Sequence, residues 1–382
     1  MFGNWKRLAG AVVLSVALAA CQVVPKGRGP VVAPAPVPTS APGALPEDQG
    51  RHRVALLVPL SGANSAVGQS ISNAATMALL DTNASNLRIT TYDTATGAGS
   101  AAARAISDGN KLILGPLLGD DVQPVLAKAR PAHVPLISFS NDRSVASRDA
   151  FIMGVLPEES IDRTVTYALA HGSKRFAAIV PNGDYGRHAQ AALAERVAAG
   201  GGTLVATETY DRGNTSVISA AQRLRSKGGF DTVLIADGAR LSAIAAGSLK
   251  TAGAALPRLL GTELWSGEEE IAKATALRGA WFSTVSDARY GRFASSYKSR
   301  FGAQPYRIAT LGYDAVLLTL RIARDWTPGR DFPSSKLYDD TGFLGIDGAF
   351  RFRPNGVAER AMEVRQVGAG TVTVVSPAPT QF

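Results

Sequence analysis

Cysteine is nearly absent from this chain of 382 residues, which contains a single one, Cys21. One thiol excludes an internal disulfide, a CxxC redox pair and a cysteine-rich metal site. Histidine is scarce as well, and the four histidines are spaced too widely for an HExxH motif. A GxSxG elbow and a phosphate-binding loop are also missing from the sequence. We therefore expect no metal, no cofactor and no enzymatic activity.

Long apolar runs are few, and the most informative is residues 8–20, which follows two basic residues and ends in small ones. Roughly 20 apolar residues are needed to span a bilayer as a helix, so this shorter run is typical of a secretory signal. With Cys21, its end resembles a bacterial lipobox. The resemblance implies a signal peptide at 1–20, lipidation of Cys21 and a membrane anchor, and Gln22 favours the outer membrane over the inner one. An ordinary signal peptide with a chance cysteine is the alternative.

Residues 21–50 are unusually rich in proline. Seven of the chain's 21 prolines lie between residues 25 and 46. Proline breaks helices and favours the extended polyproline II conformation. This segment is predicted to be a tether, although a disordered leader fits the composition equally well.

Acidic residues are fewer than basic ones, and the net charge is +9. In an exported protein this excess does not indicate nucleic acid. It suggests the acidic cell wall or an acidic protein partner, and a merely soluble surface explains the same charge.

From about residue 51 to residue 375, short buried-strand runs alternate with helical stretches. Strands are expected at 54–58, 88–92, 112–114, 135–139, 176–180, 203–209, 232–236, 259–260 and 281–282. Helices are expected at 67–80, 101–106, 122–129, 160–170, 189–199, 217–226 and 241–252. This alternation predicts right-handed βαβ units. The length favours two domains, each with a parallel sheet, and ligands bind such sheets at the carboxyl ends of the strands.

Local motifs in a characteristic order resemble the type I periplasmic binding proteins. They are the opening strand and loop at 54–62, Asp184-Tyr185-Gly186 after a strand, a helical pair at 293–315 and the strands at 345–352. The resemblance implies an α/β fold of two lobes, each a parallel sheet flanked by helices, with a cleft between them. The implied boundaries are lobe 1 at 52–153 and 284–330, lobe 2 at 154–283 and 331–375, and a tail at 376–382.

One subfamily, the leucine-binding-protein type, consists of receptors for amino-acid ABC transporters. Tyr185 and Glu263 match its tyrosine and its ammonium-binding glutamate, which would imply an amino-acid-like ligand and an ABC permease as partner. Three positions depart from its pattern, namely Gly119, Asp142 and Gly238. An aspartate near an incoming carboxylate would repel it, so the departures argue against ordinary amino-acid capture.

A second subfamily comprises the outer-membrane lipoproteins that activate penicillin-binding proteins. Its local phrases resemble residues 58–62, 114–118 and 156–160, and the lipobox and tether fit it as well. The leading hypothesis is therefore a lipid-anchored regulator of peptidoglycan synthesis that docks onto a penicillin-binding protein. The ABC-transporter receptor is the alternative.

Candidate ligand-binding residues follow the ends of predicted strands. In lobe 1, hydroxyl and amide side chains there could hold a carboxylate, or could serve turns equally well. They are Ser61, Ser138, Ser140 and Asn141. Tyr185 and Glu263 are expected to face the same cleft from lobe 2. Paired carboxylates near helix starts are interpreted as caps, with Ser266 and Glu269 forming a capping box.

Overall fold

The computed structural model describes residues 50–213, 215–250 and 256–380. The chain divides into two units, Met1–Pro46 and Glu47–Phe382, and the described residues all lie in the second. Cys21, the signal peptide at 1–20 and nearly all of the predicted tether lie outside the described residues, so the predictions for them stand untested. Within the described ranges, no helix is long and apolar enough to cross a membrane.

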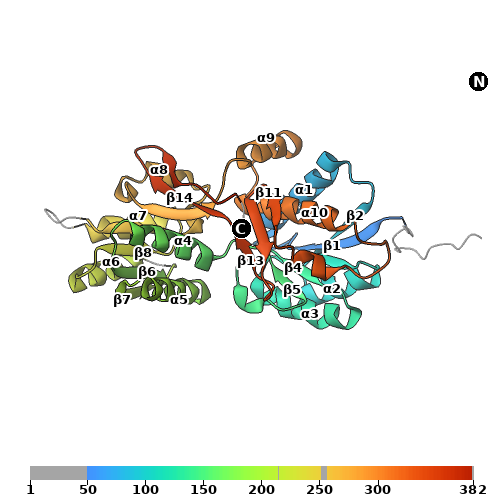
Figure 1. The fold of residues 1–382 in the computed structure, drawn as a ribbon, viewed down its shortest axis with the longest axis horizontal. Coiled ribbons are helices and arrows are strands. Elements are labelled where there is room, and N and C mark those ends of the chain that lie inside the picture. The colour runs from blue at the N-terminus through green and yellow to red at the C-terminus, as the bar shows by residue number, and fades with distance from the viewer. Residues whose placement is uncertain (1–49, 214, 251–255, 381–382) are drawn as a thin grey trace, which may run out of the picture. The chain divides into compact units, whose positions relative to one another are not determined.

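Lobe 1 is built on a five-stranded parallel sheet of order β2-β1-β3-β4-β5 (Figure 1). The strands are β1 His52–Val58, β2 Leu87–Asp93, β3 Leu112–Leu114, β4 Leu136–Ser138 and β5 Ala150–Ile152. The central strand β1 is apolar along most of its length because both of its faces are covered, as in other parallel sheets. The covering helices are α1 Ser65–Thr82, α2 Ala98–Ser107 and α3 Val122–Ala129.

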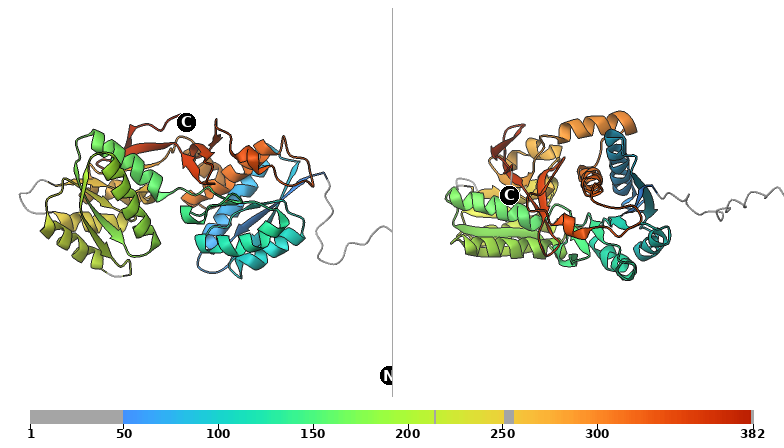
Figure 2. Two further views of the ribbon diagram at one scale, coloured as in Figure 1. Left: turned by 60° about the horizontal axis from the view of Figure 1, so that its bottom comes forward. Right: turned by 45° about the vertical axis from the view of Figure 1, so that its right-hand side comes forward.

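Lobe 2 contains a seven-stranded sheet of order β15-β14-β10-β9-β8-β6-β7. Its parallel part comprises β6 Arg175–Pro181, β7 Thr203–Tyr210, β8 Thr232–Ile235, β9 Arg258–Leu260 and β10 Trp281–Val285. Two antiparallel strands extend it, β14 Met362–Val367 and β15 Val372–Ser376. The helices are α4 Pro157–Ala170, α5 Asp184–Ala199, α6 Ser216–Lys227, α7 Ala239–Leu249 and α8 Glu269–Lys273. Figure 2 shows each sheet between its helices.

The segment after β10 returns to lobe 1. It forms α9 Tyr290–Phe301 and α10 Thr310–Ile322, followed by a small antiparallel sheet of β11 Phe343–Gly345, β12 Gly348–Phe352 and β13 Ala358–Arg360. The chain therefore passes between the lobes three times, after β5, after β10 and after β13. We call these three passages the crossovers.

Two of the predicted lobe boundaries need correction. Residues 331–375 were expected in lobe 2, but Phe332, Phe343 and Phe350 belong to the same hydrophobic core as β1 and α10 of lobe 1. Three short strands cannot bury their apolar side chains alone, so this small sheet packs on lobe 1, and only β14 and β15 join lobe 2. Conversely, β10 keeps residues 284–285 in the lobe 2 sheet by pairing with β14.

Candidate functional site

A cavity of about 400 Å³ is lined by residues of both lobes. Its lobe 1 wall is mainly apolar and includes Leu117, Phe139, Ile308 and Leu311. Lobe 2 contributes mixed side chains from the turn that follows β9 and from the end of β10. A concave site with an apolar wall and a few polar groups is the usual form of a small-molecule site.

Glu263 is the acidic group of this cavity. It begins the 3₁₀ turn Glu263–Trp265, whose preceding residue Thr262 caps it by accepting a hydrogen bond from Leu264 N. One carboxylate oxygen, Oε1, accepts a hydrogen bond of 3.0 Å from Tyr185. The other, Oε2, is buried and has no hydrogen-bond partner among the residues that the structure describes. The site thus presents a fixed carboxylate with one acceptor atom left for a ligand.

Burial raises the pKa of Glu263 to about 7, and the hydrogen bond from Tyr185 only partly opposes this rise. The charge of nearby Glu158 adds to the increase. Burial and the Glu263 carboxylate also raise the pKa of Tyr185 well above its ordinary value, so its hydroxyl stays protonated and donates to Glu263. A cation in the cavity would stabilise the ionised form of Glu263.

Tyr185 is held in place by its surroundings. It stands in the first turn of α5, and its hydroxyl also lies 2.9 Å from Thr262 Oγ1. The Arg212 guanidinium lies 5.3 Å from the centre of its ring. Asp237 in turn accepts a 2.8 Å bond from Arg212 Nε and another from the backbone of Gly238. Sequence reasoning missed Arg212 and Asp237. Asp237 directly precedes Gly238, the position where a second tyrosine was expected, and Arg212 is bonded to Asp237.

The predicted serines of lobe 1 form hydrogen bonds within the protein. Ser61 donates to Asp93 Oδ2 at 2.7 Å, and Ser138 donates to the carbonyl of Pro116 at 2.8 Å. Ser140 is buried and its hydroxyl accepts from the backbone of Asp142 at 3.0 Å. These hydrogen bonds match the alternative role considered for the serines, which is to stabilise turns. The amide Asn141, by contrast, lines the cavity.

The two departing positions of lobe 1 lie side by side. A Cβ atom added to Gly119 would stand 3.2 Å from Ser140 Oγ and 3.3 Å from Asp142 Cβ. The Asp142 carboxylate itself accepts a 2.8 Å bond from the backbone of Ser144. This compact turn has little room for the serine expected at position 119. The Ser140 hydroxyl and the Asp142 carboxylate already accept hydrogen bonds from backbone N–H groups.

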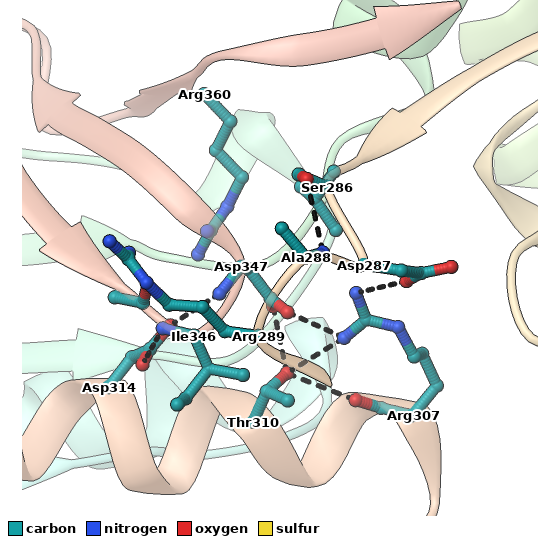
Figure 3. Close-up of polar contacts among 12 residues, drawn as sticks. Ser286, Asp287, Ala288, Arg289, Arg307, Thr310, Asp314, Ile346, Asp347 and Arg360 are labelled. Atoms are coloured by element: carbon teal, nitrogen blue, oxygen red, sulfur yellow. Dashed lines mark hydrogen bonds and ion pairs between the residues drawn. The ribbon is translucent and has the colours of Figure 1, made fainter. Parts of the chain in front are cut away.

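Arg307, which sequence reasoning also missed, lines the cavity just before α10. Its guanidinium bonds Asp347 Oδ1 at 2.5 Å and Asp287 Oδ1 at 3.3 Å (Figure 3). It also lies over the ring of Tyr290 at 4.3 Å. Thr310 donates to the second oxygen of Asp347 at 2.8 Å. The Nε atom of Arg307 is buried and lacks a partner within the described part of the chain. No local signal marks this residue, because its partners come from two other segments, residues 287–290 and Asp347.

The expected capping box at Ser266 and Glu269 is wrong. Helix α8 begins at Glu269, so the N-cap is Glu268, and no side-chain cap bond forms. Gly267 has a φ of +78° and separates Ser266 from the helix. Ser266 instead lines the cavity, and its buried Oγ lacks a hydrogen-bond partner among the described residues. The Glu158–Glu159 pair does lie in the first turn of α4, as expected.

Metal coordination has no candidate in the described ranges, where no three or more histidine, cysteine or acidic side chains form a group that could hold an ion. The cavity offers carboxylate, guanidinium, amide and hydroxyl groups for hydrogen bonding.

Residues 52–371 match the family described as periplasmic binding protein. The chain therefore belongs to the periplasmic binding protein family, whose members are periplasmic substrate-binding proteins and not enzymes. It is 25% identical over 180 residues to the uncharacterized protein RP748 of Rickettsia prowazekii (strain Madrid E), an alignment that spans 47% of this chain and 48% of that protein.

Two solved structures show the same fold. The leucine-binding protein LivK of Thermotoga maritima MSB8 is 19% identical, with a TM-score of 0.67 over 86% of this chain and 98% of that one. A solute-binding protein of an ABC transporter from R. palustris, solved with benzoate, is 17% identical, with a TM-score of 0.66 over 86% and 98% of the chains. These likenesses establish the two-lobed type I fold.

Proposed function

We propose that this protein is the solute receptor of an ABC transporter and binds a small amine-bearing molecule with an apolar body. The free Oε2 of Glu263 carries this proposal, because a buried carboxylate without a partner is costly until a donor reaches it. The apolar wall that includes Leu117 and Phe139 would cover the body of the ligand. Membership of a substrate-binding family and the ABC-transporter neighbours support the same function.

The opposite end of the ligand would meet lobe 1. The cavity is lined by the polar side chains of Asn141 and Arg307 in lobe 1, and by Ser266 of lobe 2, whose Oγ lacks a partner among the described residues. A carboxylate on the ligand could meet these donors, whereas the amine is the group for which the cavity offers the unbonded acceptor of Glu263.

Isothermal titration calorimetry with three probes tests this requirement. L-Leucine and 3-methylbutylamine share an apolar body and an amine but differ in the carboxylate, whereas benzoate has a carboxylate and no amine. We expect heat of binding from at least one of the two amines and none from benzoate. Binding of benzoate alone, or silence from both amines at millimolar concentration, would contradict the proposal.

A charge-removing variant then locates the binding. Glu263→Gln keeps the size of the side chain and should weaken the amine at least tenfold. The matched control is Glu268→Gln, because Glu268 is exposed and lies five residues further along the same loop. Equal affinities in the two variants would show that Glu263 does not bind the ligand.

The leading sequence hypothesis, a regulator that docks onto a penicillin-binding protein, receives no specific support from the comparisons. It rests on three local phrases, the lipobox and the tether, and stays a hypothesis together with lipid anchoring at Cys21 and outer-membrane localisation. A purified synthase whose polymerisation and crosslinking rates do not change on addition of this protein would rule it out. Mass spectrometry of the mature N-terminus would test the lipid.

A further inference from the structure

A second cavity of about 650 Å³, which shares no lining residue with the cleft cavity, lies where the first and third crossovers run side by side. Helices α4 and α5 of lobe 2 supply one side of it, and the segment from Arg351 to Met362 supplies the other. The segments that lead into the two crossovers are joined in lobe 1, since Ile152 N at the end of β5 donates to the carbonyl of Gly356, just before β13, at 2.8 Å. Both lobes therefore contribute to this cavity, which the proposed cleft function does not use.

Charged atoms without partners face one another in this second cavity. Glu158 is 8% exposed, and its Oε1 lies 3.3 Å from Arg143 Nε and 3.7 Å from His188 Nδ1, whereas its Oε2 has no partner in the described part of the chain. Oε2 of Glu159 is also buried and unbonded among these residues. Arg360 is 5% exposed, and its Nε and Nη1 atoms have no partner within the same ranges. Native proteins leave few such atoms unsatisfied, so each one here calls for a bound group.

The side chains that carry these atoms are fixed in position. The backbone N–H of Arg360 donates to Glu159 Oε1 at 3.1 Å, its Nη2 donates to the carbonyl of Met153, and its guanidinium lies over the ring of Phe350 at 5.2 Å. Arg143 Nε lies 3.3 Å from Glu158 Oε1 as an ion pair. The open atoms of Arg360 and Glu159 are thus those that remain after these anchoring contacts are made.

We propose that this second cavity binds a small zwitterion, a free amino acid or a short peptide, with its ammonium on Glu158 and Glu159 and its carboxylate on Arg360. A zwitterion satisfies unbonded acceptors and unbonded donors at once. Burial raises the pKa of Glu159 to about 8, and a ligand ammonium would stabilise its ionised form. A simple anion would leave the acceptor atoms of Glu158 and Glu159 unbonded, and a bare cation would leave the guanidinium unbonded. Because the ligand would contact both lobes, its binding would also bias their relative rotation.

The test uses calorimetry on the Glu263→Ala variant, in which the proposed cleft site is disabled. The probes are L-alanine, L-lysine, L-glutamate and L-alanyl-L-alanine. We expect at least one of them to bind and Glu159→Gln, added to this background, to weaken that probe at least tenfold. This substitution keeps an acceptor for the backbone N–H of Arg360 while removing the charge. Glu270→Gln, an exposed residue of α8, is the control that should change nothing.

Two results would overturn the proposal. One is that none of the four probes binds the Glu263→Ala variant at millimolar concentration. The other is that a probe binds equally well after Glu159→Gln and after Arg360→Lys, which keeps the charge but removes Nη1. Thermal unfolding confirms that each variant is folded. Neither result bears on the cleft, because cleft binding is measured with Glu263 intact and tested by Glu263→Gln.

Discussion

The hydroxyl of Tyr185 donates a 3.0 Å hydrogen bond to Oε1 of Glu263 and thereby joins the first turn of α5 to the turn that follows β9. Because this bond occupies one carboxylate oxygen, Oε2 is left as the acceptor that the proposed ligand would meet. The acidic end of the cleft is thus held by a bond between two elements of lobe 2.

Tyr185→Phe removes that bond and leaves a buried carboxylate without its donor. We expect the free energy of unfolding to fall by about 1–3 kcal/mol, the usual cost of an unsatisfied buried acceptor, and amine affinity to fall as well. Urea denaturation and calorimetry measure the two effects. Tyr306→Phe is the control, since Tyr306 is 49% exposed, and an equal loss there would show that the effect is not specific.

Amine affinity should rise with pH across neutrality. The pKa of Glu263 is raised to about 7, so the carboxyl is increasingly neutral below that value and attracts an ammonium less. Calorimetry between pH 5.5 and 8 should show tighter binding at the higher pH, with the trend lost in Glu263→Gln. A pH-independent affinity in the parent protein would contradict the assignment.

The stability of the ligand-free protein should respond to pH in the opposite direction. A carboxyl whose pKa is higher in the folded state than in the unfolded state binds more protons when folded, so its contribution to stability is lost as pH rises through the folded pKa. Burial raises the pKa of Asp314 to about 7, like that of Glu263. The temperature of the unfolding midpoint should therefore decrease as the pH rises from 5 to 8, and Glu263→Gln should remove part of that decrease.

Gly345→Ala should destabilise lobe 1. A Cβ atom there would lie 2.2 Å from Oδ2 of Asp314, and that carboxyl is fixed by a 2.7 Å bond from Ile346 N. Overpacking of this kind costs about 1–3 kcal/mol. The matched control is Gly291→Ala in α9, where a Cβ meets nothing within 4 Å, and there we expect a gain of up to about 1 kcal/mol.

The corrected boundary of lobe 1 predicts the effect of Phe350→Ala. Phe350 is 1% exposed within the core that contains β1 and α10, so we expect a loss of about 3–5 kcal/mol. Leu344→Ala, on the neighbouring strand and 59% exposed, should change stability by less than about 0.5 kcal/mol. Chemical denaturation of both variants distinguishes a core position from a surface one.

The regular elements were largely predictable, because their apolar periodicity is strong. Helix α3 was predicted at 122–129 and is observed at Val122–Ala129. Strand β5 was missed, although β3, which is equally short, was predicted. Strand β14, of sequence MEVRQV, places charged residues in buried positions, where contacts such as Arg365 with Glu363 at 2.7 Å compensate for them.

The site was predictable only in part. Tyr185 and Glu263 were chosen together from the resemblance, and the structure brings them into contact. Arg307 could not be chosen this way, because Asp287 and Asp347 approach it from segments that lie far along the chain. Likewise, whether the hydroxyl of Ser138 faces a ligand or a backbone carbonyl depends on turn geometry that the sequence does not encode locally.

The junctions between the crossovers constrain how the lobes can move. Arg360, the last residue of β13, bonds the carbonyl of Met153 at the first crossover and Glu159 in α4, while Arg365 of β14 bonds Asp287 at the second crossover. These contacts tie the ends of β13, β14 and α4 to the crossovers. Translation of one lobe along the other would break them. The mechanical consequence is a resistance to shear between the lobes, which favours rotation about the crossovers as the motion of the molecule.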